Sequence, residues 1–190
     1  MKHRLFFALQ VALLAMMGFW GPAQADSPTL QAIQGLPQAW DKTLPANDPG
    51  GPCPANSSRF TCVMGGAAVR DNETGLVWEQ SPSTSGFTWE GAQGQCNQLG
   101  VGNRKGWRLP TIQELASLVD PTQSNPALPA GHPFSNVQSS FPFYWSATTL
   151  ATQAILAWGV HFGSGGVGDD VKTFPLFAWC VRGGQGVDPQ

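Results

Sequence analysis

The sequence predicts a single α+β domain stapled by disulfides, with two helices, a long loop and an antiparallel sheet. Residues 88–100 and 111–121 each combine a helical spacing of apolar side chains with capping residues. From residue 144 onward, short aromatic and β-branched runs alternate with glycine-rich turns, which is typical of antiparallel strands. The chain also has 4 cysteines, enough for two covalent cross-links.

Residues 1–25 have the pattern of a secretory signal peptide. Lys2 and Arg4 precede the apolar run LFFALQVALLAMMGFW, and the small residues AQA follow at 23–25. The run is shorter than a membrane span needs, and no second apolar span follows it. We therefore expect an exported protein, periplasmic or extracellular, with a mature chain of 165 residues (190 minus 25) and no membrane span.

The charge of the mature chain argues against two classes of partner. It has 8 basic residues (10 minus Lys2 and Arg4) and 12 acidic ones, hence a net charge of −4 (8 minus 12). Nucleic-acid binding requires basic side chains that neutralise phosphates, and anionic lipid attracts the same side chains. We therefore expect neither nucleic acid nor a strong electrostatic hold on lipid.

The cysteines all lie in the mature chain: Cys53, Cys62, Cys96 and Cys180. An even number in an exported chain indicates two disulfides, and three pairings are possible. The CxxC-type spacing of zinc sites is absent. Pairing the nearest neighbours closes a short proline-rich loop between Cys53 and Cys62 and leaves Cys96 for Cys180, and this is the pairing that we expect.

Residues 26–66 are rich in proline, glycine, asparagine and serine, so we expect an irregular N-terminal arm. The domain itself is expected over 67–184, with a tail at 185–190. It begins with AAVRDNETGLVWEQ, which predicts two short strands around a turn. The acidic DNET segment lacks the ligand spacing of an EF-hand, so we expect a hairpin tip there rather than a calcium site.

Two helices follow in the sequence. One face of the first, TWEGAQGQCNQLG, carries four apolar side chains: Trp89, Ala92, Cys96 and Leu99. Thr88 and Gly100 mark its ends. In the second, TIQELASLVD, Thr111 and Glu114 form a capping box, and the apolar stripe continues to Val119.

Residues 120–143 contain five prolines and no periodic pattern, so we expect a long loop, of the kind that is usually functional or disordered. Beyond it, the runs YWSATT, ILAWGVHF, DVKTF and FAWCVRG predict strands that are separated by turns such as GSGG. Alternate residues of FAWCVRG face opposite sides, and a bond from Cys180 to Cys96 would direct one of these faces towards the first helix.

Taken in order, these stretches resemble the Lcl C-terminal domain family, which is named for a collagen-like bacterial adhesin. The matching pieces run over about residues 67–184: DNETGLVWEQ, TWEGAQGQC, GWRLPTIQELASLVD, YWSATT, AWGVHF and WCVRGG. The resemblance implies a C-type-lectin-like fold, with a disulfide from the first helix to the last strand, here Cys96 to Cys180. It also implies binding of sulfated polysaccharides and host surfaces, with which the adhesin's domain is associated.

The sequence departs from these relatives in three ways. It lacks the Glu-Pro-Asn and Trp-Asn-Asp motifs of sugar-binding C-type lectins, it contains no Gly-X-Y tract, and its net charge suits a sulfated polymer poorly. We expect a secreted, non-catalytic recognition domain that binds a glycan or a cell-surface protein, in the manner of an adhesin. No cofactor is expected.

Two other functions stay open on the sequence alone. A structural or assembly role in a cell-envelope complex is one, because a loop-rich, tryptophan-rich surface also serves protein partners. The other follows from a related fold that supports formylglycine-generating enzymes, oxidoreductases that work through reactive cysteines. Here every cysteine has a disulfide partner and no catalytic motif appears, so we expect a binding protein rather than an enzyme.

The stretch GNRKGWRLPTIQEL is either a basic ligand patch or a structural hinge. We expect Arg108 to be structural, hydrogen-bonded to buried carbonyls or to a carboxylate such as Glu79. Thr111 and Glu114 are structural as the helix cap. Arg104 and Lys105 lie in a turn, where we expect them to be solvated.

Ligand contacts are expected where the 120–143 loop meets the region 158–172. The residues concerned are Trp158, His161, Asp169, Asp170, Lys172 and His132. Their indole, imidazole and carboxylate groups suit a polar glycan or peptide. The alternatives are a core position for Trp158, structural histidines, and a solvated hairpin tip at the aspartate pair. Calcium is conceivable at that pair with loop carbonyls, but no motif indicates it, and we expect no metal site.

Overall fold

The computed structural model describes residue 53, residues 58–140 and residues 143–183. The expected signal peptide, most of the expected arm and the 185–190 tail lie outside the described residues. The chain divides into two units, 1–36 and 37–190, and every described residue belongs to the second. Within the described residues, no helix has the length and apolar character that crossing a membrane requires.

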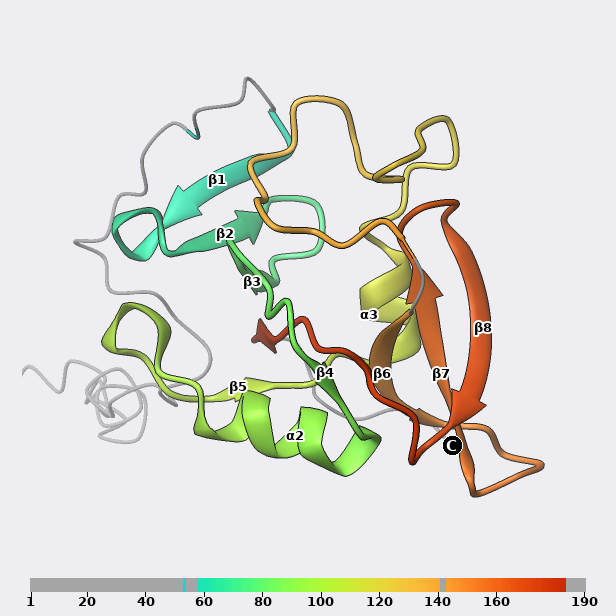
Figure 1. Ribbon diagram of the computed structural model, residues 1–190. Helices are drawn as coiled ribbons and strands as arrows, with labels where there is room; N and C mark the ends of the chain where they lie inside the picture. Colours follow the sequence, from blue (N-terminus) through green and yellow to red (C-terminus); the bar gives the residue numbers. More distant parts are fainter. Residues whose placement is uncertain (1–52, 54–57, 141–142, 184–190) are drawn as a thin grey trace, which may run out of the picture. The chain divides into compact units, whose positions relative to one another are not determined.

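Among the described residues, two sheets and two α-helices confirm an α+β domain (Figure 1). The first sheet has the order β1-β2-β3-β10-β5. Its strands are β1 (Phe60–Val63), β2 (Ala68–Asp71), β3 (Val77–Glu79), β10 (Val181–Arg182) and β5 (Trp107–Arg108). The second sheet has the order β4-β9-β6-β7-β8. Its strands are β4 (Gly86–Phe87), β9 (Leu176–Phe177), β6 (Tyr144–Thr149), β7 (Leu156–His161) and β8 (Gly166–Val171).

The sheets differ from the expected arrangement in three respects. β1 lies in the range expected to be an irregular arm, yet it pairs along its whole length with β2. The early hairpin does not stand apart from the later strands, because β10 joins β3 and β5 in the same sheet. One pair in the second sheet, β6 with β9, is parallel rather than antiparallel.

The expected strand at 177–182 is divided between the two sheets. Phe177 ends β9 in one sheet and Val181 begins β10 in the other. The alternation of faces nevertheless persists: Trp179 and Val181 belong to one core cluster, while Ala178 and Cys180 belong to the other. Because both clusters collect side chains from both sheets, this segment joins the two sheets through the core.

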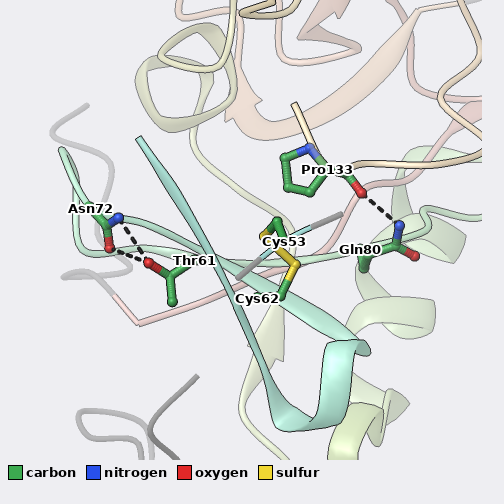
Figure 2. Close-up of a disulfide and its surroundings, with 6 residues drawn as sticks. All are labelled: Cys53, Thr61, Cys62, Asn72, Gln80 and Pro133. Carbon is green, nitrogen blue, oxygen red and sulfur yellow. Dashed lines mark hydrogen bonds between the residues drawn. A yellow bond between two sulfur atoms is a disulfide. The ribbon is translucent and has the colours of Figure 1, made fainter. Parts of the chain in front are cut away.

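Helix α2 (Trp89–Gln98) has the expected face and cap. Ala92 and Cys96 are buried, and the Thr88 hydroxyl accepts a hydrogen bond from the Gly91 N–H at 3.2 Å. The Cys96–Cys180 disulfide ties this helix to the segment between β9 and β10. The second expected disulfide, Cys53–Cys62, ties residue 53 to β1 (Figure 2).

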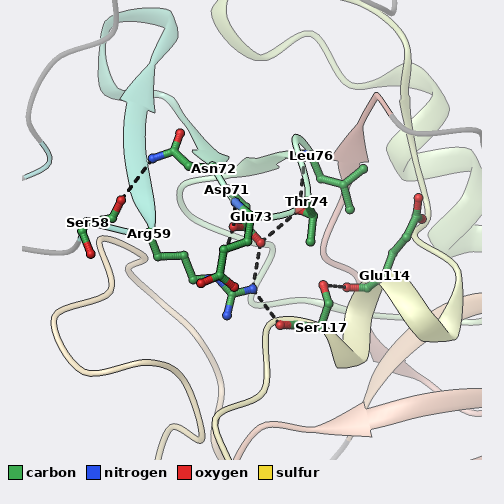
Figure 3. Close-up of polar contacts among 9 residues, drawn as sticks. All are labelled: Ser58, Arg59, Asp71, Asn72, Glu73, Thr74, Leu76, Glu114 and Ser117. Atoms are coloured by element: carbon green, nitrogen blue, oxygen red, sulfur yellow. Dashed lines mark hydrogen bonds and ion pairs between the residues drawn. The ribbon is translucent and has the colours of Figure 1, made fainter.

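Helix α3 (Ile112–Ala116) begins as expected but is shorter. The Thr111 hydroxyl accepts the Glu114 N–H at 3.2 Å, and the Glu114 carboxylate accepts the Thr111 N–H at 2.9 Å, which completes the capping box. The helix ends at Ala116 instead of continuing to Val119. A tertiary contact meets it there, because Arg59 donates to the Ser117 carbonyl at 2.7 Å (Figure 3).

The same arginine organises the β2–β3 turn. Arg59 donates to both carboxylate oxygens of Asp71, at 3.1 and 2.8 Å, and Asp71 also accepts hydrogen bonds from the Glu73 N–H and the Thr74 hydroxyl (Figure 3). Burial raises the pKa of Asp71, but these donors outweigh burial and hold the pKa below its ordinary value. This fully buried carboxylate therefore links the turn to α3.

The described part of the long loop, residues 120–140, has no helix or strand; we call it the strap. Ala127, Leu128 and Phe134 of the strap are buried. At one end the Ala127 N–H donates to the Phe162 carbonyl at 2.6 Å. At the other, Gln80 donates to the Pro133 carbonyl at 2.7 Å (Figure 2). The strap is thus part of the packed domain rather than a detached ligand loop.

Candidate functional site

The predicted ligand residues concentrate on the β7–β8 hairpin, whose pairing is continuous from Leu156 opposite Val171 to His161 opposite Gly166. Trp158 lies opposite Asp169, and Ala157 lies opposite Asp170. Residues that are directly opposite share one face of a sheet. Trp158 and Asp169 therefore occupy one face, together with Val167.

The expectation that the two aspartates form a hairpin tip is wrong. β8 begins at Gly166, so both aspartates lie within the strand, and the turn consists of residues 162–165. Gly166 and Gly168 adopt extended conformations and pair with β7 instead of turning the chain. A glycine-rich sequence permits either outcome, and the unbroken match to β7 decides between them here.

Trp158 differs from most of the other described tryptophans. Trp78, Trp107, Trp145 and Trp179 are fully buried, whereas Trp158 is half-buried and belongs to neither core cluster. Half-burial leaves part of its indole at the surface, beside the exposed carboxylate of Asp169. Of the predicted ligand residues, Asp169 is the one that is exposed, and Trp158 lies directly opposite it.

Lys172 and His161 already have partners within the domain. The Lys172 ammonium donates to the Thr149 hydroxyl at 2.8 Å and lies 3.9 Å from the centroid of the Trp89 ring. The His161 Nδ1 lies 3.0 Å from the Ser164 hydroxyl. The contacts of Lys172 stabilise the end of the hairpin opposite its turn, and the contact of His161 stabilises the turn itself. Both side chains therefore have a structural role in the hairpin.

His132 is not brought to the hairpin by any contact that the structure gives it. It lies on the strap, where its ring stacks on that of Phe134 with the ring centroids 6.0 Å apart. Its buried Nδ1 has no hydrogen-bond partner among the described residues. Burial lowers the pKa of His132. The strap is hydrogen-bonded to the hairpin near its turn. There the Asn125 N–H donates to the Gly163 carbonyl, and the Ala127 N–H donates to the Phe162 carbonyl.

The sequence reasoning missed a set of exposed apolar side chains around the same hairpin. Among the described residues, the large hydrophobic side chains that are exposed are Ile155 at 66%, Val167 at 50% and Phe174 at 51%. Ile155 precedes β7, Val167 lies within β8, and Phe174 follows β8. Exposed apolar side chains on neighbouring segments are a feature of interaction sites when they form a contiguous patch. Exposure cannot be recognised from residue type, and these residues resemble core residues in the sequence.

We define the β8 surface as Ile155, Val167, Asp169 and Phe174, which are exposed, with Trp158 beside it. Figure 1 shows β8 as the outermost strand of its sheet, with β7 between it and β6. No other described strand pairs with its outer edge. The surface therefore combines exposed apolar side chains, the carboxylate of Asp169 and the backbone groups of a sheet edge.

Arg108 makes the contacts of a structural residue, but not with Glu79 as suggested by the sequence. Its guanidinium donates to both carboxylate oxygens of Glu114 at 2.7 Å and to the Gly183 carbonyl at 2.6 Å. Glu79 instead accepts the Cys180 N–H at 2.8 Å. Burial raises the pKa of Glu79 to about 7, although that hydrogen bond lowers it in part.

The cysteines and the acidic residues bear on possible chemistry. All four cysteines are paired in the two disulfides, so no thiol is present in this structure. In the part of the chain that the structure describes, no group of three or more His, Cys, Asp or Glu residues could hold a metal ion.

The model of one protein family, the Lcl C-terminal domain, matches residues 67–182. The chain belongs to the Lcl C-terminal domain family. The matched residues include the second sheet, α2 and α3, and therefore the β8 surface. β1 and the Cys53–Cys62 disulfide precede the matched residues. No curated protein matches this chain.

Proposed function

We propose that this exported protein is a non-catalytic recognition domain that binds a macromolecule outside the cell through the β8 surface. The observation that carries the proposal is the position of Ile155, Val167 and Phe174, which flank or belong to one hairpin. Their exposure leaves apolar area in water, which a bound partner would cover. The four paired cysteines support a binding role over the reactive-cysteine chemistry considered above.

A protein fits this surface better than a glycan. Sugar binding favours an exposed flat aromatic face surrounded by polar groups, whereas Trp158 is half-buried and two of the exposed side chains, Ile155 and Val167, are aliphatic. Apolar side chains inside a polar rim are the usual composition of a protein interface. A cell-surface protein is therefore the favoured ligand, and a glycan is the alternative outcome of the test.

The C-type-lectin-like fold implied by the family is part of this proposal. Its support is the presence of two helices, a long strap and a disulfide from α2 to the end of the second sheet. The strap is packed into the core, which moves the expected site away from the loop and onto the hairpin. Membership of an envelope complex would use the same surface for a permanent partner.

The test is a binding screen of residues 26–190 against surface proteins and glycans, with and without calcium. The double variant Ile155→Ser and Phe174→Ser should abolish binding, while Thr84→Ala, at an exposed position after β3, should leave it unchanged. Binding that survives the double variant would place the site elsewhere. If a glycan binds the wild-type protein but not the Trp158→Ala variant, the ligand is a glycan rather than a protein. Isolation of a stable complex from the cell envelope would favour the assembly role.

A further inference from the structure

We propose that the partner adds to the outer edge of β8 as an extended strand, with a cationic side chain opposite Asp169 and an apolar side chain opposite Val167. This inference rests on the proposed function, because it specifies how the β8 surface is occupied. It names the partner by chemistry: a segment of a protein in which a lysine or arginine and an apolar residue are two positions apart, so that both lie on the same face of the added strand.

The direction of the backbone groups in β8 follows from two hydrogen bonds. The Lys172 N–H donates to the Ile155 carbonyl at 2.9 Å, so it points towards β7. Successive N–H groups in a strand alternate in direction, so those of Gly168 and Asp170 also point towards β7. Those of Val167, Asp169 and Val171 therefore point away from the sheet. The Val171 N–H is accepted by the Asp170 carboxylate at 2.7 Å, consistent with this assignment.

The two remaining outward N–H groups belong to Val167 and Asp169, and both residues are exposed. Protein edges are commonly blocked by lysine, proline or a bulge, and residues 166–171 include no lysine or proline. Their pairing with β7 has no bulge. Gly166 and Gly168 also carry no side chain that could shield the edge; a Cβ placed on Gly166 would meet only the Ser164 hydroxyl within 4 Å. A further strand can therefore approach over most of β8.

The acidic side chains of β8 favour a partner strand that carries a cationic residue. Asp169 and Asp170 are the charged side chains of β8, and both are acidic. In the register that sets Asp169 opposite its own counterpart, a second copy of this chain would bring two carboxylates together, which is destabilising. A cationic residue opposite Asp169 is favourable for the same reason. An apolar residue two positions away on the same face would cover Val167.

The experiment measures binding of a fluorescein-labelled peptide with the repeat Lys-Ser-Val-Ser (the lysine–valine peptide) to residues 26–190, by fluorescence anisotropy at low salt; the repeat places lysine and valine two positions apart on one face. Val167→Pro removes an outward N–H without touching the ladder to β7, and Val167→Ala removes only side-chain contact. We expect Val167→Pro to bind about tenfold more weakly than Val167→Ala, the loss expected for one or two main-chain hydrogen bonds. Asp169→Asn should also weaken binding, and by less as salt is raised.

A second measurement leaves the protein unaltered, in case Val167→Pro unfolds. The same peptide with every amide N-methylated cannot pair with a strand, so it should not bind, and nor should a glutamate–valine peptide. Equal binding of the N-methylated peptide, or equal affinities of Val167→Pro and Val167→Ala, would overturn strand addition. Self-association of the protein that Val167→Pro abolishes would identify a second copy as the occupant and overturn the cationic partner.

The two proposals fail differently. Suppose that a protein ligand fails to bind the Ile155→Ser and Phe174→Ser double variant but binds a folded Val167→Pro variant normally. That result would leave the proposed function intact and refute strand addition. A ligand that is insensitive to all three changes would refute both.

Discussion

Trp158 and Asp169 lie directly opposite each other in the ladder between β7 and β8. A half-buried indole thus shares a face with an exposed carboxylate on the outermost strand of the sheet. Aspartate is a poor strand residue, and an aromatic side chain is better stabilised by a β-branched neighbour. The proposed recognition role would account for an aspartate at this position at some cost in stability.

Asp169→Thr should therefore stabilise the domain. Threonine has a higher strand propensity and packs against the facing indole, so the free energy of unfolding should rise by about 0.5 kcal/mol. Urea unfolding at neutral pH measures this. The same variant should bind the lysine–valine peptide less well, and a destabilised variant would show that Asp169 supports the fold.

Arg108→Ala should destabilise the domain without altering the β8 surface. The change removes two charge-assisted bonds to Glu114 and one to the Gly183 carbonyl, and we expect a loss of about 2–3 kcal/mol. Arg108→Lys should recover only part of it, because an ammonium cannot form the bidentate pair. Thermal unfolding tests both variants. Arg104→Ala is the control, expected within about 0.5 kcal/mol of wild type; a fully stable Arg108→Ala protein would disprove the structural role.

Stability should depend on pH through Glu79. Burial raises the pKa of Glu79 from 4.5 to about 7, so between these values the folded state binds more protons than the unfolded state. The free energy of unfolding therefore falls as pH rises, and the contribution of Glu79 is fully present below pH 4.5 and lost through pH 7. The loss should be on the order of 2–3 kcal/mol.

Glu79→Gln provides the matched comparison, because the amide oxygen can still accept the Cys180 N–H. The variant should lack the decline in stability between pH 5 and pH 7 that wild type shows, as measured by urea unfolding across that range. His132 acts in the opposite direction: burial lowers its pKa, so its contribution is lost as pH falls below its ordinary value of 6.5. His132 contributes equally to both proteins, so its effect cancels in the difference between their free energies of unfolding. If the free energies of unfolding of wild type and Glu79→Gln change with pH in parallel, the prediction is contradicted.

The disulfides predict the thiol content and much of the stability. Thiol titration of denatured, unreduced mature protein should find none, and reduction should release 4. The double variant Cys96→Ser and Cys180→Ser should cost about 4–5 kcal/mol, because this bond closes the longer loop, with a sequence separation of 84. The corresponding change at Cys53 and Cys62, separated by 9, should cost about 3 kcal/mol. Two titratable thiols in the native protein would restore the reactive-cysteine hypothesis.

Several local features were predictable because neighbouring residues determine them. Thr88 and Thr111 cap their helices through bonds that reach at most three residues along the chain. The β2–β3 turn follows from Asp71 and Gly75 in the same way. The contacts that were not predictable join distant segments: Arg59 with Ser117 at the end of α3, and Arg108 with Gly183.

The sequence by itself determined the α+β class, the caps, the alternating faces of 177–181 and the family, because each depends on residue type and short spacing. Only the tertiary structure decided that β10 joins the first sheet, that β8 starts at Gly166, and that Ile155, Val167 and Phe174 remain exposed. The physical reason is that burial and strand pairing depend on which distant segments come together. Valine in a strand is equally suited to a core and to an edge, and the position of β8 at the end of its sheet leaves Val167 at the surface.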